Sequence, residues 1–298
     1  MISEQWDLGQ ICRYLDFPEE AIRALSAAER EIAKNREAQI RLDRATDALF
    51  IEGSREFERE GEETAKIAGV DRKSADMLML LRGLPRLAAN YRAAGIDESI
   101  FRDTAHDLLW KLRECRACFG VWGTFVTAWF PGFYRMTRFA VGRLQYEPIG
   151  FPLDEYEGLR RGDVVYNCHI PSSGPLTEEA VEDSLRRAAK FYGCADGIFP
   201  VFCSSWLLYP PMAEAVYPEG SNLEKFYRRF TILSEEKDEK CGDFWRVFHR
   251  FYSEGALKGA AEDTALQRNL KKFLSDGGHM GHGRGVILFR AEDGRTEE

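Results

Sequence analysis

The spacing of apolar residues in the first third of the chain is helical. Residues 18–49 place apolar side chains on one face among many Glu, Arg and Ala residues, which predicts a helix. Residues 97–118 predict another helix by the same spacing. The apolar positions are Ile22, Leu25, Ala28, Ile32 and Ile40 in the first helix and Phe101, Ala105, Leu108, Leu109 and Leu112 in the second.

Between these segments the pattern predicts shorter elements. Two helices are expected at residues 74–84 and 87–94, with a break near Gly83 and Pro85, because proline cannot donate a backbone hydrogen bond inside a helix. Residues 61–70 are polar and are expected to join helices. Because no strand pattern occurs before about residue 120, the sequence predicts an all-helical domain over residues 1–120.

Strand patterns begin after residue 120. The clearest is residues 163–170 (DVVYNCHI), followed by a loop of small residues and by a helix that Thr177 can cap and Gly193 can end. Another buried strand is expected at residues 198–208 (IFPVFCSSWLL). Further strands are expected within 133–147 and at 230–233, 244–248 and 285–290, further helices at about 221–230 and 263–276, and residues 121–130 fit either a helix or a strand.

The strand, loop and helix between residues 164 and 192 form a βαβ unit together with the next strand. Such a unit requires a parallel strand pair. The predicted fold class is therefore α+β: an all-helical N-terminal domain is followed, over residues 121–298, by an α/β domain with a mixed sheet around this central unit.

Composition and charge narrow the possible classes of protein. The chain has 298 residues, is 44% hydrophobic and 30% charged, and carries a net charge of -8, which fits a globular protein and argues against a broad nucleic-acid surface. No apolar run reaches the roughly 20 residues needed to cross a bilayer, and no secretory signal is visible. The 7 cysteines have scattered spacings, so we expect reduced thiols and a cytoplasmic protein without a membrane partner.

The loop at the centre of the βαβ unit, residues 172–177, has the composition of an anion site. It leads from a strand into a helix start, where unpaired backbone N–H groups and the helix dipole favour a negative group. Glu178 and Glu179 in the first helical turn already complement that dipole and would repel a phosphate that they faced. The alternative interpretation is an ordinary crossover loop with a helix cap.

Several motifs occur in an order that resembles a known family. They are GRLQYE at residues 142–147, HIPSSGPL at 169–176, CSSWLL at 203–208, SNLEKFYRRF at 221–230, DTALQRNL at 263–270 and GHGRGVILF at 281–289. In the first half, AHDLLW at 105–110 and the segment 122–129 add to the likeness. As a set they resemble a bacterial family of GNAT-like acyltransferases, which join a helical N-terminal acyltransferase domain to a GNAT-like C-terminal domain.

The resemblance implies a GNAT-like core, in which the strand before the loop splays from its neighbour and an acyl-pantetheine lies in the gap. The splayed pair would be residues 164–170 and 199–208, and the co-substrate would be acetyl-CoA or another acyl-CoA. Its pyrophosphate would lie on the loop, and the implied CoA-binding residues are Ile170, Ser172, Ser173, Gly174, Leu176 and Thr177. The loop itself has one glycine and two prolines instead of the Gln/Arg-x-x-Gly-x-Gly/Ala of ordinary GNAT enzymes.

Acyl transfer to an amine requires a proton acceptor near the nitrogen and a hydrogen-bond donor at the thioester oxygen. Under the resemblance the candidate bases are Glu147 and His169, because each is expected near a strand end beside the central unit. A backbone N–H between Cys168 and Ile170 could polarise the carbonyl. The alternatives are a hydrogen-bonded structural histidine and an ion pair of Glu147 with Arg143.

Tyr227 is the candidate acid that would protonate the departing thiolate, because it follows the second strand of the central unit on the next helix. Core packing beside Phe226 and Phe230 is the alternative. Cys203 could act as a nucleophile with His169, and the alternative is a buried, inert thiol.

No metal site is expected. The single CxxC, Cys115 to Cys118, has no second pair at zinc spacing. His279 and His282 lie among glycines in residues 278–285 and could line a ligand; the alternative is a flexible turn between a helix and a strand.

Three functions from different classes fit these features. The first is an acyl-CoA-dependent N-acyltransferase that moves an acetyl or other short acyl group to an unidentified small-molecule or peptide amine. The second is a non-catalytic protein that binds CoA or another ligand on a degenerate GNAT scaffold, which the departures in the loop keep open. The third makes the helical half a protein-interaction module. The sequence carries no signal for an oligomeric state.

Overall fold

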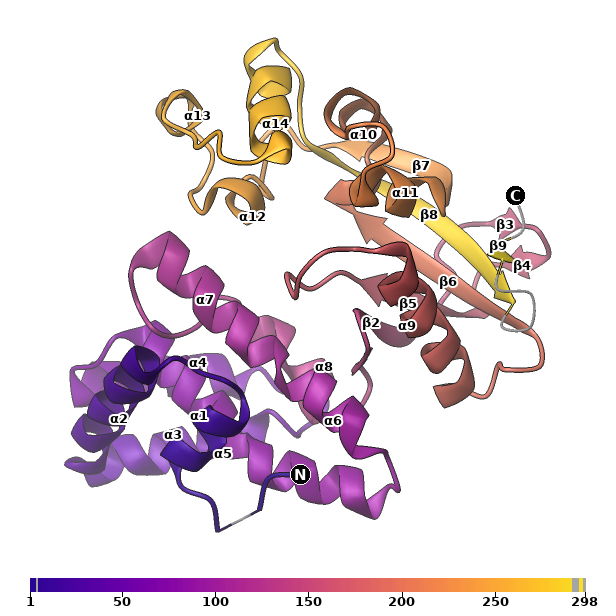
Figure 1. Cartoon of the computed structure of the whole chain (residues 1–298). Helices are drawn as coiled ribbons and strands as arrows, with labels where there is room; N and C mark the ends of the chain where they lie inside the picture. Colours follow the sequence, from indigo (N-terminus) through magenta and orange to yellow (C-terminus); the bar gives the residue numbers. More distant parts are fainter. Residues whose placement is uncertain (4, 291–294, 297–298) are drawn as a thin grey trace. The chain divides into compact units, whose positions relative to one another are not determined.

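The computed structural model describes residues 1–3, 5–290 and 295–296. The chain divides into two compact units, Met1–Ala140 and Val141–Glu298. The first is helical and the second is built on a mixed sheet (Figure 1), which confirms the predicted fold class.

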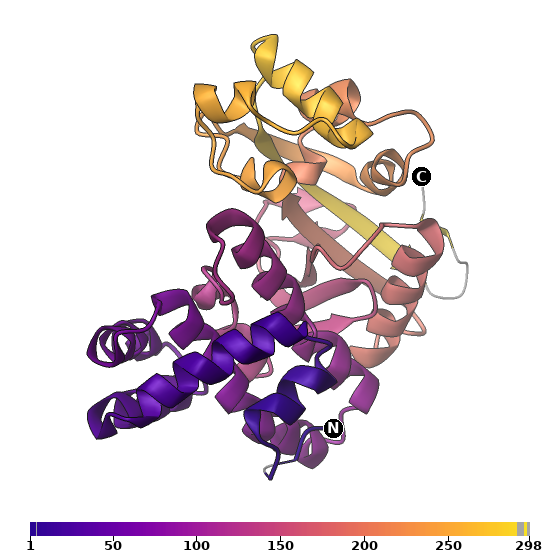
Figure 2. The ribbon, with the colours of Figure 1, turned by 60° about the vertical axis from the view of Figure 1, so that its left-hand side comes forward.

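The first unit is a bundle of helices (Figure 2). Their bounds are α1 Leu8–Tyr14, α2 Glu19–Ala33, α3 Arg36–Ala48, α4 Glu56–Ala68, α5 Arg72–Ala93, α6 Glu98–Ala105, α7 Asp107–Phe119 and α8 Pro131–Tyr134, with a 3-10 turn η1 at Thr127–Trp129. The single helix expected over residues 18–49 is two helices, because Asn35 accepts hydrogen bonds from the backbone of Glu37 and Ala38 and starts α3 anew.

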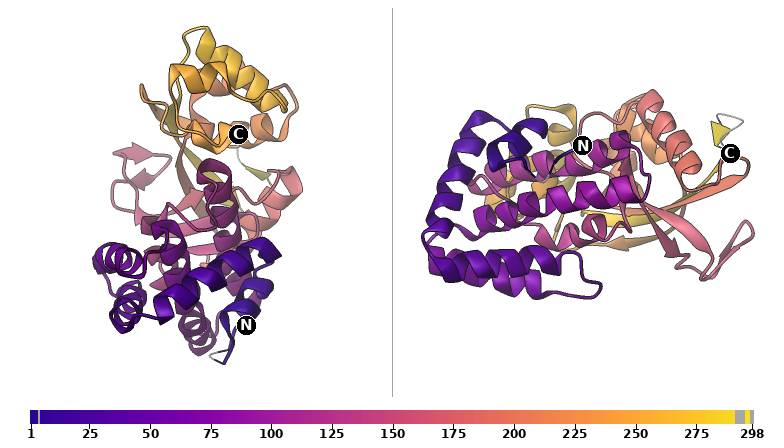
Figure 3. Two further views of the ribbon diagram at one scale, coloured as in Figure 1. Left: turned by 90° about the vertical axis from the view of Figure 1, so that its left-hand side faces the viewer. Right: turned by 90° about the horizontal axis from the view of Figure 1, so that it is seen from below.

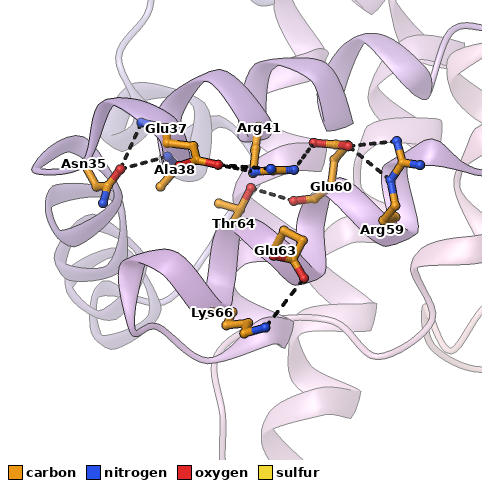
Figure 4. Close-up of polar contacts among 9 residues, drawn as sticks. All are labelled: Asn35, Glu37, Ala38, Arg41, Arg59, Glu60, Glu63, Thr64 and Lys66. Carbon is orange, nitrogen blue, oxygen red and sulfur yellow. Dashed lines mark hydrogen bonds and ion pairs between the residues drawn. The ribbon is translucent and has the colours of Figure 1, made fainter.

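The prediction that the polar residues 61–70 join two helices is wrong, because these residues lie largely in α4. Directly before this segment, Glu60 of α4 carries a charge that is paired with α3 (Figure 4). Glu60 is buried, and its carboxylate oxygens lie 3.0 Å from Arg41 of α3 and 3.0 Å from Arg59. Burial raises the pKa of Glu60, but the hydrogen bond from Arg59 and the charge of Arg41 outweigh it and lower the pKa. The buried carboxylate therefore joins α3 to α4.

The two short helices expected around Pro85 are also wrong, because α5 runs through that residue as one helix. Most of α5 is buried, so packing against its neighbours outweighs the one backbone hydrogen bond that proline removes. Gly83 serves close packing instead of a break: a Cβ there would lie 2.7 Å from the ring of Tyr134.

The segment after α7 folds with the helices, so the first compact unit extends beyond the boundary expected at residue 120. It is irregular apart from η1, neither the helix nor the strand that residues 121–130 fitted. Thr124 donates its backbone N–H to the carbonyl of Lys73, and Thr127 donates its hydroxyl to Asp76, 2.8 Å away. The hydroxyl of Tyr134 donates to the carbonyl of Leu80. These bonds to α5 hold the segment on the helical unit.

The second unit contains a seven-stranded sheet in the order β1-β2-β5-β6-β8-β7, with β9 pairing with β8. The bounds are β1 Phe139–Val141, β2 Leu144–Gly150, β5 Val164–His169, β6 Ile198–Ser205, β7 Thr231–Lys237, β8 Gly281–Arg290 and β9 Arg295–Thr296, and a separate hairpin consists of β3 Glu155–Tyr156 and β4 Leu159–Arg160. β5 and β6 are parallel and are joined by α9, whereas β2–β5, β6–β8 and β7–β8 are antiparallel. The predicted central βαβ unit is thus confirmed.

The helices of this unit are α9 Glu178–Phe191, α10 Pro210–Val216, α11 Asn222–Arg228, α12 Trp245–Phe248, α13 Glu254–Lys258 and α14 Ala265–Ser275, with a 3-10 turn η2 at Trp206–Leu208. The strand expected at residues 244–248 is wrong: α12 forms there, and the rings of Phe244 and Phe248 pack 4.4 Å apart. The flexible turn considered for residues 278–285 is wrong from Gly281 onward. A Cβ at Gly283 would lie 1.9 Å from the carbonyl oxygen of Leu208, so the glycine allows β8 to pass η2 closely.

The two faces of the sheet have different cover, and in the left view of Figure 3 α9 and the β3–β4 hairpin lie on opposite sides of it. On what we call the α9 face, the hydroxyl oxygens of Tyr146 (β2) and Ser184 (α9) lie 3.1 Å apart. On what we call the hairpin face, Phe151, Val165, Phe202 and Val286 form a buried cluster against which Tyr156 and Leu159 of the hairpin pack. Because side chains alternate along a strand, each residue of β2, β5, β6 and β8 is assigned to one face.

Candidate active site

The parallel strands β5 and β6 separate toward their carboxyl ends. Their paired positions are Tyr166 with Val201 and Asn167 with Phe202. Beyond Asn167, β5 stays paired with β2 as far as His169, and β6 stays paired with β8 as far as Ser205. A gap therefore opens between two strands that are each held by their other neighbour. Carboxyl ends of parallel strands are where α/β proteins place ligands.

Glu147 and His169 meet on the hairpin face beside this gap. The β2–β5 register sets Glu147 opposite Asn167 and Gln145 opposite His169, so all four side chains project from one face. Glu147 Oε1 lies 2.8 Å from His169 Nε2 and 3.2 Å from Asn167 Nδ2. The side chains of His169 and Glu147 are 20% and 19% exposed. The structure thus brings together the two candidate bases that the sequence analysis ranked separately.

The hydrogen bonds limit which nitrogen of His169 can accept a proton. Asn167 Nδ2 lies 3.2 Å from both Glu147 Oε1 and His169 Nε2, and it donates to the carboxylate oxygen. When Glu147 is ionised, the tautomer with a proton on Nε2 directs that proton at the same oxygen. Nδ1 then carries the lone pair. A carboxylate that orients an imidazole in this way also stabilises the imidazolium formed after proton transfer. The arrangement can therefore abstract a proton through His169 while Glu147 remains charged.

The loop between β5 and α9 presents backbone donors at a helix start. Gly174 has φ +113°, a conformation that side-chain-bearing residues rarely adopt. Thr177 caps α9 by accepting from the backbone N–H of Ala180. The backbone N–H groups of Ser173, Gly174, Leu176 and Thr177 donate to no acceptor within the described part of the chain. These donors, with the helix dipole, can hold an anion such as a diphosphate.

One of the two glutamates at the start of α9 is paired with a cation, which weakens its repulsion of an anion at the loop. Glu178 pairs with Lys225 of α11, 2.6 Å away, and this hydrogen bond and charge lower the pKa of Glu178. The local charge is thereby neutralised by a neighbouring helix. Glu179 is exposed on the surface of α9.

Arg143 is the residue of this region that sequence reasoning missed. It was considered only as an ion-pair partner for Glu147, yet its guanidinium donates to the carbonyl oxygens of three loop residues, Pro171, Gly174 and Pro175. The signal that could have found it was its place in the GRLQYE motif, immediately after a turn glycine. Burial lowers the pKa of Arg143 to about 10, so the guanidinium remains charged at neutral pH.

Tyr227 lies on α11, whereas Glu147 and His169 lie on β2 and β5. Its side chain is half-buried. The rings of Phe226 and Phe230 pack against each other, 5.3 Å apart. Burial, followed by the charges of Glu214 and Glu235, raises the pKa of Tyr227, which keeps its hydroxyl protonated at neutral pH.

Cys203 lies on the α9 face, because its neighbour Phe202 belongs to the hairpin face. His169 is on the hairpin face, so it cannot activate this thiol across the sheet. Cys203 is fully buried, and a hydrogen bond to Cys203, together with burial, raises the pKa of the adjacent Cys168. These features favour an inert thiol over a nucleophile.

Neither a metal-binding cluster nor a membrane-spanning helix occurs among the residues that the structure describes. No group of three or more His, Cys, Asp and Glu side chains gathers closely enough there to bind a metal ion. None of the helices described is both long and apolar enough to cross a bilayer.

Comparison with known proteins adds a family and a fold. Residues 138–287, half of the chain, match the family described as GNAT-like C-terminal domain, and residues 6–136 match the N-acyltransferase N-terminal domain. No curated protein matches the sequence.

Solved structures of acyltransferases share the fold. A mutant acyltransferase in complex with octanoyl-CoA is 21% identical, with a TM-score of 0.74 over 94% of this chain and 86% of its own. An acyltransferase in complex with decanoyl-CoA and teicoplanin is 21% identical, with a TM-score of 0.73 over 93% and 86%. An acyltransferase in complex with decanoyl-CoA is 22% identical, with a TM-score of 0.68 over 95% of this chain and all of its own.

Proposed function

Because this chain belongs to the family with a GNAT-like C-terminal domain, we propose that it is an acyl-CoA-dependent N-acyltransferase. The observation that carries the proposal is the splay of β5 from β6 beyond Asn167, with a His–carboxylate pair on one side and a donor-lined loop at its end. A thioester held in such a gap lies within reach of both. The same arrangement supports no other group-transfer donor as well as a long molecule with a diphosphate at one end.

The loop residues fit the diphosphate of CoA. The N–H groups of Ser173, Gly174, Leu176 and Thr177 supply donors that need an acceptor, and Gly174 adds no side chain that would obstruct an approaching phosphate. Of the other two residues proposed to bind CoA, Ser172 begins this loop and Ile170 follows β5 at the splay. A bound acyl-CoA would supply an activated acyl group as a thioester.

In the proposed reaction His169 is the base. Its Nδ1 accepts the proton that the amine releases as the C–N bond forms and the C–S bond breaks, while Glu147 stabilises the imidazolium through Nε2–H. A backbone N–H between Cys168 and Ile170 faces the carbonyl oxygen and stabilises its developing charge. Tyr227 remains the proposed proton donor to the departing thiolate, because its hydroxyl is protonated at neutral pH.

The acceptor we propose is a primary amine on a small molecule or a peptide. One structural neighbour is a complex with teicoplanin, which supports a peptide-like acceptor without identifying it for this chain. The acyl group expected from the sequence is acetyl or another short chain, whereas the neighbours were crystallised with octanoyl-CoA and decanoyl-CoA. The acyl series therefore has to span both lengths.

The test is thiol release from acyl-CoAs of two to ten carbons in the presence of a panel of amines: amino sugars, amino acids and short peptides. We expect turnover with at least one pair, and mass spectrometry should find the acylated amine. If no pair releases thiol, and yet CoA raises the melting temperature, the enzyme proposal fails and a binding protein is left. Saturation at 100 times Kd corresponds to about 2.7 kcal/mol of added stability.

A non-catalytic CoA-binding protein is the second candidate because the loop IPSSGPLT departs from the ordinary GNAT signature. Under that reading the Glu147–His169 pair is structural, and His169→Ala should lower the melting temperature without changing any turnover. If CoA neither raises the melting temperature nor supports turnover, the remaining interpretation, a protein-interaction module, is favoured.

A further inference from the structure

Resting on the proposed function, we infer that Arg143 is a positioning residue that holds the loop 171–176 in the conformation that binds the diphosphate of the acyl donor. The guanidinium lies behind the loop and collects its carbonyl oxygens. The distances are 2.9 Å to Pro171, 2.7 Å to Gly174 and 3.1 Å to Pro175. One side chain from the β1–β2 turn thus restrains three peptide groups of a loop that has no regular backbone ladder of its own.

Peptide geometry explains why this contact matters for an anion. In a trans peptide the carbonyl and the next N–H point in opposite directions, and the described chain contains no cis peptide. Holding the carbonyl of Pro175 toward Arg143 therefore turns the N–H group of Leu176 away from it, and the contact with Pro171 fixes the start of the loop. The carbonyl of Gly174 precedes a proline, so its contact fixes the turn at φ +113° without orienting a donor.

Arg143 itself is held by the helix that follows the loop. The hydroxyl of Ser184 on α9 donates to the carbonyl of Val141, 2.5 Å away, and accepts from the N–H of Leu144 at 3.1 Å. These two bonds clamp the turn on both sides of Arg143, and Gly142 in that turn has φ +67°. Arg143 thus holds the loop, and α9, which follows the loop, holds the turn that carries Arg143. Preorganised sites require support of this kind from the residues around them.

These hydrogen bonds take the place of the Gly-x-Gly/Ala loop by which ordinary GNAT enzymes orient their backbone donors. A loop with two prolines and one glycine offers fewer backbone donors than a Gly-x-Gly/Ala loop, so their directions must be better fixed. The guanidinium has donors on three nitrogens in one plane, and Nε, Nη1 and Nη2 of Arg143 each bond a different carbonyl, whereas all donors of lysine are on one nitrogen.

The experiment compares two acyl donors that share the thioester but differ in the diphosphate: acyl-CoA and the corresponding acyl-pantetheine. In Arg143→Met we expect kcat/KM for acyl-CoA to fall at least about tenfold, mainly through KM, because uniform binding is lost. With acyl-pantetheine the value should change less than about twofold. The ratio of the two donors is a readout that a merely structural role would not move.

Two further variants keep the result interpretable. Arg229→Met removes another partly buried arginine of this unit, which pairs with Glu182 on α9, and should leave the ratio at the wild-type value. Arg143→Lys keeps the charge and should reduce the ratio by a smaller amount; it serves if Arg143→Met does not fold. An equal loss with both donors in the folded Arg143 variants would overturn the inference.

The inference and the proposed function fail separately. If the wild-type protein turns over neither donor, calorimetric titration with CoA and with pantetheine takes the place of kinetics. Arg143→Met should then weaken CoA binding alone, at least about tenfold, although the acyltransferase proposal has failed. Unchanged CoA affinity in that variant would overturn the role of Arg143.

Discussion

Two histidine–carboxylate pairs lie on the hairpin face at the same end of the sheet, and they differ in what surrounds them. His169 and Glu147 are 2.8 Å apart beside the splay, where β5 has separated from β6. His282 of β8 and Asp243, in the segment after β7, are 2.9 Å apart, and β8 is paired with β6 on one side and β7 on the other. Nearly equal distances thus occur at an open and at a closed place in one sheet.

The charges around the second pair mark it as structural. Arg246 also pairs with Asp243, and the β7–β8 register sets Glu236 opposite His282. Burial raises the pKa of Asp243, but the hydrogen bond from His282 and the charge of Arg246 outweigh it and lower that pKa. The hydrogen bond to Asp243 raises the pKa of His282. A pair that favours its charged forms fastens the segment after β7 to β8. A histidine–carboxylate pair therefore suggests chemistry only where a neighbouring strand leaves room for a substrate.

The largest expected difference between the pairs is in turnover. His169→Ala removes the proposed base, and general-base catalysis contributes about 10²–10⁴-fold, so kcat should fall by that factor. His282→Ala should change kcat by less than about twofold, since it lies away from the splay. Steady-state thiol release with saturating acyl-CoA measures both. Equal losses in the two variants would erase the functional distinction between the pairs.

The carboxylates should separate the pairs by a smaller factor. Glu147→Gln keeps an acceptor for His169 but removes the charge; charged hydrogen bonds contribute about 1.5–3 kcal/mol, equivalent to about 10- to 150-fold in kcat. Asp243→Asn should instead leave kcat nearly unchanged and reduce the free energy of unfolding by about 1–3 kcal/mol. Thermal melting and steady-state kinetics of both variants test whether one loses activity and the other loses stability. A large loss of kcat in Asp243→Asn would contradict it.

The splay could be inferred only in part from the sequence. Alternating apolar residues predicted β5, the loop and α9 close to their observed bounds, because strand and helix periods are local properties. The contact between Glu147 and His169 depends on the β2–β5 register. Periodicity does not encode this register, because it pairs segments that are distant in the sequence. The resemblance supplied the expectation of a gap, and the pairing of β5 and β6 gives its position.

Local patterns misled where tertiary contacts compensate for them. Pro85 breaks a helix by itself, yet burial carries α5 through it. The polar stretch 61–70 indicated a linker, yet it lies largely in α4, which Glu60 joins to α3 through Arg41. Arg143 was missed for the same reason: its partners are carbonyl oxygens, and no residue type in the loop announces that they need a donor.

The smallest effect that we expect is in the pH dependence of the free energy of unfolding, to which the His282–Asp243 pair contributes. The raised pKa of His282 adds stability that is complete below its ordinary value of 6.5 and is lost as the pH rises through the folded value. The lowered pKa of Asp243 adds stability above its ordinary value of 3.8, which is lost as the pH falls. His282→Ala should therefore lower stability most between about pH 4 and 6.5, and less at higher pH.

The size of that loss is limited by solvent. The His282 side chain is 40% exposed, so screening holds the contribution to about 1 kcal/mol or less. Besides Asp243, the charges of Asp238 and Arg246 act on His282, and they too belong to the segment that the pair fastens. Melting temperatures of wild type and His282→Ala from pH 4.5 to 9 measure the difference. His279→Ala removes a nearby histidine with no ion pair among the described contacts and serves as the matched control. A His282→Ala difference that grows above pH 7 would show that the histidine is stabilising as a neutral group, and the contrast with His169 would need another physical basis.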